Sequence, residues 1–478
     1  MLAFSNDYYG MIFRATQSVE LFCAYEIFSV RGKNYIIIFP EIPFWIAVSQ
    51  QGFLALEEMK LTGSIENVAR KVFGSVKEDS VAEVEKFFRP LIESSVLHKN
   101  KEDKTKKVEL KPNKITFLQT MQCNLRCRHC CVADMPNQQM KSMSLETAKT
   151  VLQRCLTLMD EGKKGLSFLG GEPLCGDRFI ELLEFASELG FQIGLSTNGL
   201  LVNRKFAEIA KKNNINVQLS LDGTDEESHE YVRGKGTWKK VLNAIELLNE
   251  YKVDIQTNLV YHRGNIDKLE EYFDFAKKHH IKKVRLISLM NMGRAVGQME
   301  RVLLDEFVDY MYALIKKRED IIELLDETSF MGLVMGAKFS QKMISCGAGV
   351  ITLTISPDGG IYPCLNLYDE KFEMCNILDE NFYEKFQNSY VRKIFQDLHI
   401  AQINKECREC NMKYFCGGRC RGETFQEKGD ITVPYPYCDE WKKAMEKIFW
   451  ILTEYPQLGE KKYLQISENA GEYLDLWH

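Results

Sequence analysis

Four cysteines lie within the stretch CNLRCRHCC, from Cys123 to Cys131, and this density of thiols predicts a disulfide knot, a zinc site or an iron-sulfur cluster. A chain of 478 residues with 45% hydrophobic content can bury large cores without disulfides. Its first residues, MLAFSNDYYG, contain neither the basic nor the unbroken apolar segment of an export signal. We therefore expect a cytoplasmic protein whose 15 cysteines are metal ligands, catalytic thiols or buried apolar side chains.

The composition does not favour a membrane or nucleic-acid partner. The most apolar early stretch, NYIIIFPEIPFWIAV, is interrupted by Pro40, Glu41 and Pro43 and is too short to cross a bilayer as a helix. The net charge is -5, whereas phosphate binding usually requires a clustered basic face. We expect no membrane and no nucleic-acid partner.

The spacing of the first thiols favours a cluster over zinc. Zinc sites usually have four closed ligands, often in paired C-x2-C units. Cys123, Cys127 and Cys130 instead form C-x3-C-x2-C. Three thiolates can bind three irons of a cubane cluster and leave the fourth iron open to chemistry.

The elements that must position these thiols begin near residue 115. Strand-like segments alternate there with amphipathic stretches such as LETAKTVLQRCLTLM, and the six segments are 115–120, 166–171, 191–198, 216–223, 253–260 and 283–290. Repeated βα units predict a parallel sheet with outer helices, so we expect an α/β fold with a partial (β/α)6 barrel over 115–335. Chemistry in such folds gathers at the carboxyl ends of the strands. The first cysteine cluster follows ITFLQTMQ and should lie on the loop that leaves the first strand.

The region before the barrel predicts a separate module over 1–98. Short β-rich runs precede three helical stretches, which suits a winged-helix-like α+β unit, and a lysine-rich linker covers 99–114. The last helix carries acidic side chains at 78, 79, 83 and 85, a poor surface for phosphate. We favour a peptide-binding role, with an extended peptide along a sheet edge. The arrangement resembles the precursor-recognition domain fused to enzymes that modify ribosomally made peptides.

The region after the barrel is cysteine-rich over 336–445, and a C-terminal helix and tail occupy 446–478. TLTISPDGGIYPC predicts a hairpin whose turn contains Pro357, Asp358 and Gly359. Seven cysteines follow a fixed order, with four of them as C-x2-C-x5-C-x3-C; they are Cys346, Cys364, Cys407, Cys410, Cys416, Cys420 and Cys438.

The first cluster, CNLRCRHC, resembles the signature of radical S-adenosylmethionine (SAM) enzymes, with His129 before the last thiol. The resemblance implies that Cys123, Cys127 and Cys130 are catalytic thiols that hold a 4Fe-4S cluster. It also implies that the open iron is chelated by SAM, which is cleaved to methionine and a 5′-deoxyadenosyl radical that removes a hydrogen atom from the substrate.

Further motifs resemble the SAM contacts of that family at successive strand ends. GGEP resembles the loop that receives the methionine amino group, STN and SLDG end the next two strands, and Arg233 suits a carboxylate. The cofactor-binding residues that this resemblance implies are Gly170, Gly171, Glu172, Pro173, Ser196, Asn198, Ser220, Asp222 and Arg233. Cys131 is expected not to be a ligand, whereas Cys23, Cys155 and Cys175 are expected to be packed or loop thiols.

The seven later cysteines resemble the SPASM extension of radical SAM peptide maturases, which binds two auxiliary 4Fe-4S clusters. Interleaved ligation in that family implies one cluster on Cys407, Cys410, Cys416 and Cys438. The other would be held by Cys346, Cys364 and Cys420 and would borrow a ligand or have an open iron. Thr352 occupies the position where some relatives have an eighth cysteine, and Cys375 is either a substitute ligand or a packed thiol.

These resemblances imply a maturase that installs thioether crosslinks, from cysteine sulfur to carbon, in a ribosomally synthesised precursor peptide. A ferredoxin or flavodoxin would supply electrons. Carbon-carbon crosslinking remains open. Oxidation of cysteine or serine, as in anaerobic sulfatase maturases, is less favoured because those relatives have an acid where this chain has Leu365. An iron-sulfur redox sensor that binds DNA is the non-enzymatic alternative.

Overall fold

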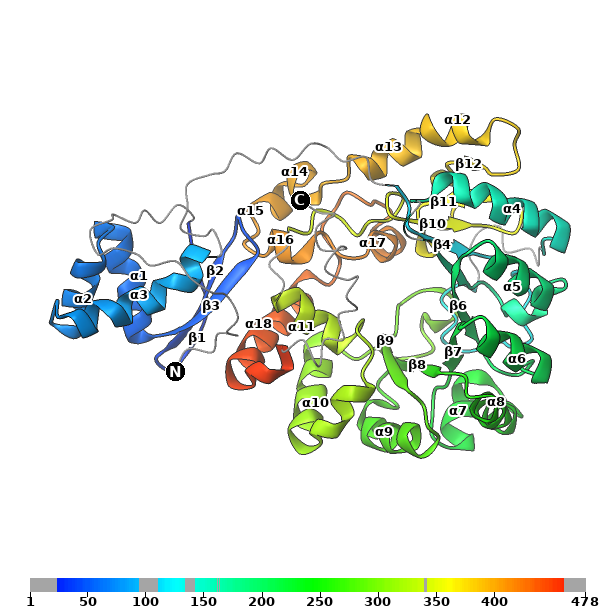
Figure 1. The fold of residues 1–478 in the computed structure, drawn as a ribbon, viewed down its shortest axis with the longest axis horizontal. Coiled ribbons are helices and arrows are strands. Elements are labelled where there is room, and N and C mark those ends of the chain that lie inside the picture. Colours follow the sequence, from blue (N-terminus) through cyan, green and yellow to red (C-terminus); the bar gives the residue numbers. More distant parts are fainter. Residues whose placement is uncertain are drawn as a thin grey trace.

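The computed structural model describes residues 24–93, 111–133, 142–160, 162, 164–338 and 342–459. Figure 1 shows a small N-terminal unit at one end, a curved sheet with outer helices at the other, and the cysteine-rich region between them. The α/β class is confirmed. Cys23, most of the predicted linker and the end of the predicted tail lie outside the described residues.

The N-terminal unit has the predicted meander and three helices. The antiparallel strands are β1 (Glu26–Arg31), β2 (Asn34–Phe39) and β3 (Phe44–Ser49). The helices are α1 (Gln50–Thr62), α2 (Ile65–Phe73) and α3 (Glu78–Glu93). Ser49 and Ser64 cap α1 and α2 by accepting backbone N–H bonds, which defines where each helix begins. One sheet face packs on these helices through Ile37, Phe39, Ile46, Val48, Leu56, Val68 and Phe88.

The opposite face of this small sheet packs against the C-terminal helix α18 (Cys438–Glu454). The ring of Phe449 lies 4.6 Å from that of Trp45 and 5.8 Å from that of Phe28, measured between centroids. Trp450 donates its indole N–H to Ser29 Oγ at 2.9 Å. The N-terminal unit is therefore fixed to the cysteine-rich region by a buried aromatic contact.

The main sheet has nine strands in the order β12-β11-β10-β4-β5-β6-β7-β8-β9. Strands β4 to β9 pair in parallel and in sequence order, as predicted for a partial barrel. Their bounds are β4 (Lys114–Phe117), β5 (Gly165–Phe168), β6 (Gln192–Thr197), β7 (Asn216–Ser220), β8 (Ile255–Tyr261) and β9 (Lys283–Ser288).

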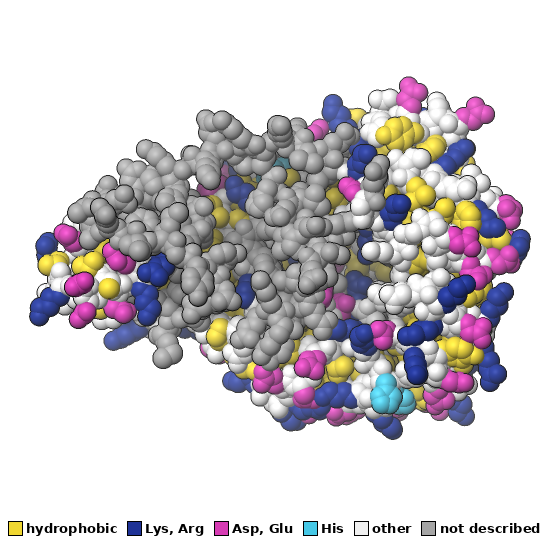
Figure 2. Space-filling model, viewed as in Figure 1, with side chains coloured by type: hydrophobic (Ala, Val, Ile, Leu, Met, Phe, Trp, Pro, Cys, Tyr) yellow, Lys and Arg dark blue, Asp and Glu magenta, His cyan; other side chains and the backbone are white. Residues whose placement is uncertain are grey.

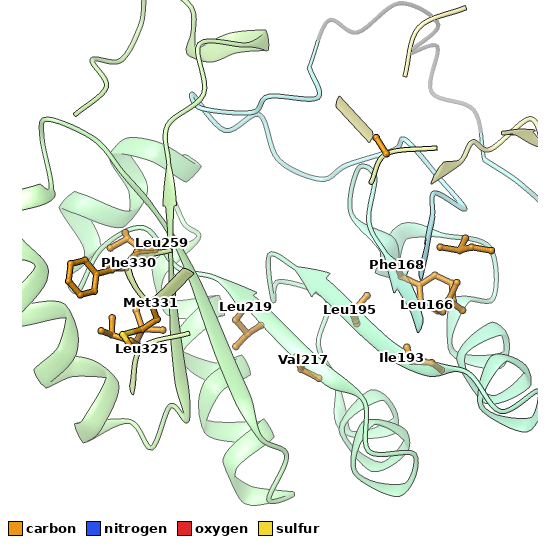
Figure 3. Packing of buried hydrophobic residues seen from close by; sticks show 14 of the residues in the cluster. Leu166, Phe168, Ile193, Leu195, Val217, Leu219, Leu259, Leu325, Phe330 and Met331 are labelled. Carbon is orange, nitrogen blue, oxygen red and sulfur yellow. The ribbon is translucent and has the colours of Figure 1, made fainter. Parts of the chain in front are cut away.

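Alternate strand residues face the outer helices. Figure 3 shows Leu166 and Phe168, Ile193 and Leu195, and Val217 and Leu219 along three adjacent strands. Phe168 meets Phe179 of α5 edge to face at 5.0 Å, so this side carries the hydrophobic core. The intervening positions are small or polar and line the inner side of the curve. The outer helices are α4 (Leu145–Leu158), α5 (Phe179–Glu188), α6 (Arg204–Lys212), α7 (Glu226–Arg233), α8 (Trp238–Glu250), α9 (Leu269–Lys278), α10 (Leu304–Lys317) and α11 (Phe330–Lys338).

The predicted hairpin is present, but it joins the barrel sheet. Strands β10 (Thr352–Ile355) and β11 (Gly360–Tyr362) are antiparallel, and β12 (Cys375–Asn376) pairs with β11. β10 also pairs in parallel with β4, so the sheet crosses from the barrel into the cysteine-rich region. The remaining helices are α12 (Phe382–Gln387), α13 (Tyr390–Gln396), α14 (Ile400–Ile403), α15 (Lys405–Glu409), α16 (Lys413–Cys416) and α17 (Arg421–Lys428).

The predicted domain boundaries remain predictions, but one of them crosses a continuous helix, because α18 runs through residue 445. On the described part of the face in Figure 2, Lys and Arg side chains are interspersed with Asp and Glu. Among the described residues, none of the helices is long and apolar enough to span a bilayer.

Candidate active site and cluster-binding thiols

The first cysteine loop leaves the carboxyl end of β4, where the sequence placed it. Cys127 is buried. Burial raises the pKa of Cys123 to about 11, and the Cys127 and Cys130 thiolates contribute to this increase. The three thiols of the motif are therefore close enough to interact electrostatically.

The GGEP loop at the end of β5 packs directly on the cysteine loop. A Cβ on Gly171 would lie 2.0 Å from the carbonyl oxygen of Gln122, and one on Gly170 would lie 2.5 Å from that of Thr120. Glu172 N–H donates to the Gln122 carbonyl at 2.8 Å, and Pro173 begins the short 3-10 turn η1 (Pro173–Cys175). The two glycines are needed because a side chain at either position would collide with the backbone that carries the thiols.

Glu172 connects the GGEP loop to the end of β6. Its carboxylate accepts hydrogen bonds from Thr197 Oγ1 at 2.6 Å and from the Asn198 N–H at 2.8 Å. Burial raises the pKa of Glu172, and these donors oppose that increase. Asn198 Nδ2 donates to Asn124 Oδ1 at 2.8 Å, which ties the STN segment to the cysteine loop. The predicted residues of β5 and β6 therefore meet around the thiols.

Asp222 and Arg233 form a buried ion pair beside the same loop. Arg233 Nε donates to Asp222 Oδ2 at 2.6 Å, and His129 Nε2 lies 2.9 Å from the same oxygen. Burial opposes ionisation of Asp222, but Arg233 and then His129 hold its pKa well below the usual range. Arg233 Nη1 lies 3.7 Å from Cys127 Sγ. A cation is thereby placed against one of the motif thiols.

The inner side of the barrel carries Ser196 and Ser220 at the ends of β6 and β7. Asn258 of β8 is paired with Ser220 in the sheet register, and its Nδ2 lies 3.3 Å from both Ser196 Oγ and Gln218 Oε1. Asn258 is 8% exposed, and its Oδ1 has no hydrogen-bond partner among the described residues. Polar groups therefore line the concave side next to the thiols, where a polar cofactor would meet them.

Sequence reasoning did not identify the segment that clamps the cysteine loop from the other side. Arg294 donates from Nε to the Cys127 carbonyl at 2.9 Å and from its backbone N–H to the Cys130 carbonyl at 3.1 Å. Gly293 has φ +56, and a Cβ there would lie 2.3 Å from the Cys130 carbonyl oxygen. Nothing in the composition or spacing of this segment, NMGRAVG at residues 291–297, signals the contact.

The seven C-terminal thiols separate into two sets. Burial raises the pKa of Cys364, and the Cys346 and Cys420 thiolates add to that increase, so these three form one set. Burial and then Cys438 and Cys410 raise the pKa of Cys407 to about 11. Cys416 interacts with the same two partners, Cys438 and Cys410, which completes a set of four. This grouping matches the interleaved ligation that the resemblance implies, and the ligand assignment stays a prediction.

The remaining described cysteines, Cys131, Cys155, Cys175 and Cys375, are not among the predicted cluster ligands. Cys375 donates its S–H to the Phe382 carbonyl at 3.6 Å, and its charged neighbours are Asp379, Glu373 and Lys385 rather than another thiol. This contact favours a packed thiol over a substitute ligand. Cys155 is fully buried in α4, Cys131 is next to Cys130, and Cys175 is at the end of η1.

The donor chemistry fits iron-sulfur clusters. Each thiolate of a 4Fe-4S cluster binds a different iron, so the thiols of one set need only face a common cube. No three His, Cys, Asp or Glu side chains among the described residues converge tightly enough to bind a single metal ion. Arg421 directly follows Cys420, and its buried Nε and Nη2 have no hydrogen-bond acceptor among the described residues, a role for which cluster sulfur is suited.

Two family models match the chain. The radical SAM superfamily matches residues 119–276, which include the first cysteine loop and the predicted SAM contacts. The iron-sulfur cluster-binding domain called SPASM matches residues 346–411, which include the first four of the seven later cysteines. Together these domains imply 4Fe-4S clusters and SAM binding.

Curated relatives match about 70% of the chain. The mycofactocin maturase MftC of Mycolicibacterium smegmatis is 29% identical over 345 residues, covering 70% of this chain and 84% of the relative. The cysteine-type anaerobic sulfatase-maturating enzyme of Clostridium novyi is 25% identical over 362 residues, covering 69% of this chain and 93% of the relative. Both relatives are maturases.

Solved structures share the fold. Streptococcus suis SuiB bound to precursor peptide SuiA has a TM-score of 0.57 at 16% identity and covers 84% of this chain and 96% of its own. Native anSMEcpe with bound AdoMet has a TM-score of 0.57 at 22% identity and covers 72% of this chain and 98% of its own. With the family matches and the maturase relatives, these findings show that the chain carries a radical SAM domain followed by a SPASM domain and is an enzyme of the radical SAM superfamily.

Proposed function

We propose that this enzyme installs thioether crosslinks, from a cysteine sulfur to a carbon of another residue, in a ribosomally synthesised precursor peptide. The observation that carries the proposal is the division of the C-terminal thiols into a set of four and a set of three. A 4Fe-4S cluster on three thiols has one iron without a protein ligand. Cysteine thiolate is the natural ligand of such an iron, so a substrate cysteine can bind there.

The cofactors would supply the reactive groups, and residues of the barrel would hold and orient those cofactors. When bound, the first cluster and SAM would supply a 5′-deoxyadenosyl radical that removes a hydrogen atom from the peptide. Cys123, Cys127 and Cys130 would hold that cluster, with Arg233 and Arg294 supporting their loop. The SAM contacts would be Gly170, Gly171, Glu172, Pro173, Ser196, Asn198, Ser220, Asp222 and Arg233.

The position of the N-terminal unit supports a peptide substrate. It contacts the loop between Cys410 and Cys416 through two polar pairs, Asn411 to Glu26 at 2.9 Å and Lys413 to Glu41 at 2.6 Å. A precursor that extends the edge of the β1-β2-β3 sheet would therefore be held beside the auxiliary thiols.

Oxidation of cysteine or serine is the second candidate, because the Clostridium novyi sulfatase-maturating enzyme is among the relatives. The residue after Cys364 weighs against it. Leu365, where those relatives carry an acid, packs in an apolar cluster that includes Leu118, Met292 and Tyr362. An apolar side chain there cannot accept the proton that this oxidation releases. Carbon-carbon crosslinking would use the same barrel and differs in the fate of the substrate thiol.

Product analysis tests the proposal. The reconstituted enzyme is incubated with SAM, a reduced ferredoxin or flavodoxin, and candidate precursor peptides that contain cysteine. Forming C–S from C–H and S–H makes the product two hydrogens lighter and removes one alkylatable thiol. One hydrogen would leave as an atom to the 5′-deoxyadenosyl group and the other as a proton, and an oxidised auxiliary iron-sulfur cluster would take the remaining electron. A product that is two hydrogens lighter but retains every thiol would instead indicate carbon-carbon crosslinking.

A further inference from the structure

The cysteine loop has an exposed basic edge where it meets α7. Arg126 and Arg128 lie on either side of the buried Cys127, and both are exposed. The Arg128 N–H donates to the carbonyl of Val232 at 2.9 Å. Its guanidinium lies over the ring of Tyr231, with the central carbon 4.3 Å from the ring centroid. The loop is thereby fixed against α7 with two cations in contact with solvent.

The turn after α7 continues this basic surface. The helix ends at Arg233, whose Nη1 lies 3.7 Å from Cys127 Sγ, and the exposed Lys235 follows two residues later. The carboxylate of Glu230 accepts the first backbone N–H of α8 at 3.1 Å. The other acidic residues of α7 are in its first turn, at the opposite end of the helix. Positive charge therefore prevails at the end of α7 that adjoins Cys127.

We define the loop-edge surface by Arg126, Arg128, Tyr231 and Lys235. None of its three cations forms an ion pair with another described residue. Tyr231 is 49% exposed. The surface therefore presents unpaired positive charge and an accessible aromatic ring beside the buried thiol of Cys127.

A surface of this kind fits an acidic electron-transfer protein. Cleavage of SAM to methionine and a 5′-deoxyadenosyl radical consumes one electron, which has to reach the first cluster from outside the chain. Transient electron-transfer complexes bury less than about 1,200 Å², so a few residues are enough to form one. Unpaired cations attract an acidic partner and speed the encounter. An exposed aromatic ring suits the flat, apolar edge of a flavin.

We propose that the loop-edge surface docks an acidic flavodoxin, which delivers one electron to the first cluster beside Cys127. The flavin is oxidised by one electron and the cluster is reduced by one electron. The three cations pair with carboxylates of the flavodoxin, and Tyr231 contacts the flavin edge. The inference rests on the proposed role of Cys123, Cys127 and Cys130 as ligands of the first cluster.

The first test measures binding of oxidised flavodoxin, which requires no turnover. A purified flavodoxin is titrated against the reconstituted enzyme by biolayer interferometry at about 50 and about 200 mM salt. Arg126→Glu/Lys235→Glu changes two exposed side chains that have no hydrogen bond or ion pair among the described residues. Its Kd at the lower salt should be at least about tenfold higher than that of the natural protein, and the difference should shrink at the higher salt because of screening. An unchanged Kd would overturn the proposal.

Lys211→Glu/Lys212→Glu is the matched control. These exposed lysines are in the last turn of α6, and neither forms an ion pair with another described residue. α6 leads into the amino end of β7, which is the end of the barrel opposite to the cysteine loop. The control changes the net charge as much as the test variant does, and its Kd should stay within about twofold of the natural value. An equal loss of affinity would show that net charge governs binding, and would refute the loop-edge surface.

Tyr231→Ser tests the choice of a flavin carrier. Loss of the ring should weaken flavodoxin binding at both salt concentrations, because an apolar contact is not screened. Tyr231→Phe should keep the affinity of the natural protein. Flavodoxin binding that is indifferent to Tyr231→Ser would refute the flavin contact, and so would a ferredoxin whose binding depends equally on Tyr231.

SAM cleavage separates this inference from the assignment of the cluster ligands. With dithionite as the reductant, Arg126→Glu/Lys235→Glu should cleave SAM at the natural rate, whereas with reduced flavodoxin its KM for flavodoxin should rise at least about tenfold. An equal loss with both reductants would show damage to the cysteine loop and would refute the docking role. Absence of SAM cleavage by the natural protein with dithionite would instead contradict the ligand assignment.

Discussion

Arg233 joins a buried carboxylate to a motif thiol: its Nε donates to Asp222 at 2.6 Å, and its Nη1 lies 3.7 Å from Cys127 Sγ. From the sequence, Arg233 and Asp222 were both expected to contact SAM. The structure pairs them with each other, so the ion pair also supports the loop that carries the first thiols. Because the pair is buried, removing one partner leaves the other uncompensated.

Replacing Arg233 with Met should therefore destabilise the protein by about 3–5 kcal/mol, because the Asp222 carboxylate loses its cation. Anaerobic urea unfolding measures the change. Asp222→Asn in the same chain should recover part of the loss. Arg178→Met is the control, because Arg178 pairs with Glu181 at the surface and its loss should cost at most about 1 kcal/mol. Equal losses in free energy of unfolding for Arg233→Met and Arg178→Met would show that the buried ion pair stabilises the protein no more than a surface pair does.

Gly293→Ala should prevent loading of the first cluster. The added Cβ would lie 2.3 Å from the Cys130 carbonyl oxygen, so the cysteine loop must move. About four irons should be missing after reconstitution. Gly297→Ala is the matched control, because Gly297 has a similar backbone angle, φ +69, but nothing lies within 4 Å of its Cβ position. Full iron content in Gly293→Ala would show that the contact is dispensable.

His229 should make the protein less stable in mild acid. Burial lowers the pKa of His229 from 6.5 to about 4, so the folded state excludes a proton that the unfolded state binds. Stability is therefore lost as pH falls from 6.5 towards 4. Between pH 7.5 and 5.5 this amounts to about 1.4 kcal/mol. His229→Asn keeps an acceptor for the Asp222 N–H. Its free energy of unfolding should therefore fall by about 1.4 kcal/mol less than that of the unchanged protein over the same pH interval. An identical decrease in both proteins would show that His229 does not cause the loss of stability in acid.

The sequence predicted local elements well and their long-range pairing less completely. The six parallel strands, the N-terminal meander and the hairpin were visible because alternation and turn residues are local signals. The parallel pairing of Leu353 in β10 with Ile115 in β4 was not predicted, because a separation of this length leaves no trace in local periodicity. The result is one sheet in place of two separate units.

This pairing predicts that the barrel will not fold well alone. A chain that ends at residue 338 lacks β10, which leaves the edge of β4 unpaired, and lacks α18, which packs against α10. Exposed edge strands promote aggregation. Size-exclusion chromatography should show soluble aggregates for this truncation and a single species for the full chain. A monodisperse truncated protein would show that the C-terminal strands are not needed.

The site was predictable to the extent that its residues carry motifs. Cysteine spacing predicted the first loop, and the GGEP, STN and SLDG segments follow consecutive strands. The grouping of the later thiols came from the resemblance to SPASM domains and stays a prediction. Arg294, Asn124 and Asn258 were missed because ordinary polar residues acquire a role only when the fold brings them to the thiols.

Iron and labile sulfide per chain after anaerobic reconstitution test the central claim that ten thiols hold three clusters. The account predicts about twelve irons and about twelve sulfides in the natural protein, at four of each per cluster. Removing Cys123, Cys127 and Cys130 should leave about eight irons, and removing Cys346, Cys364 and Cys420 should also leave about eight. About four irons in the natural protein, with none lost when the C-terminal thiols are replaced, would contradict the auxiliary clusters and with them the basis for thioether chemistry.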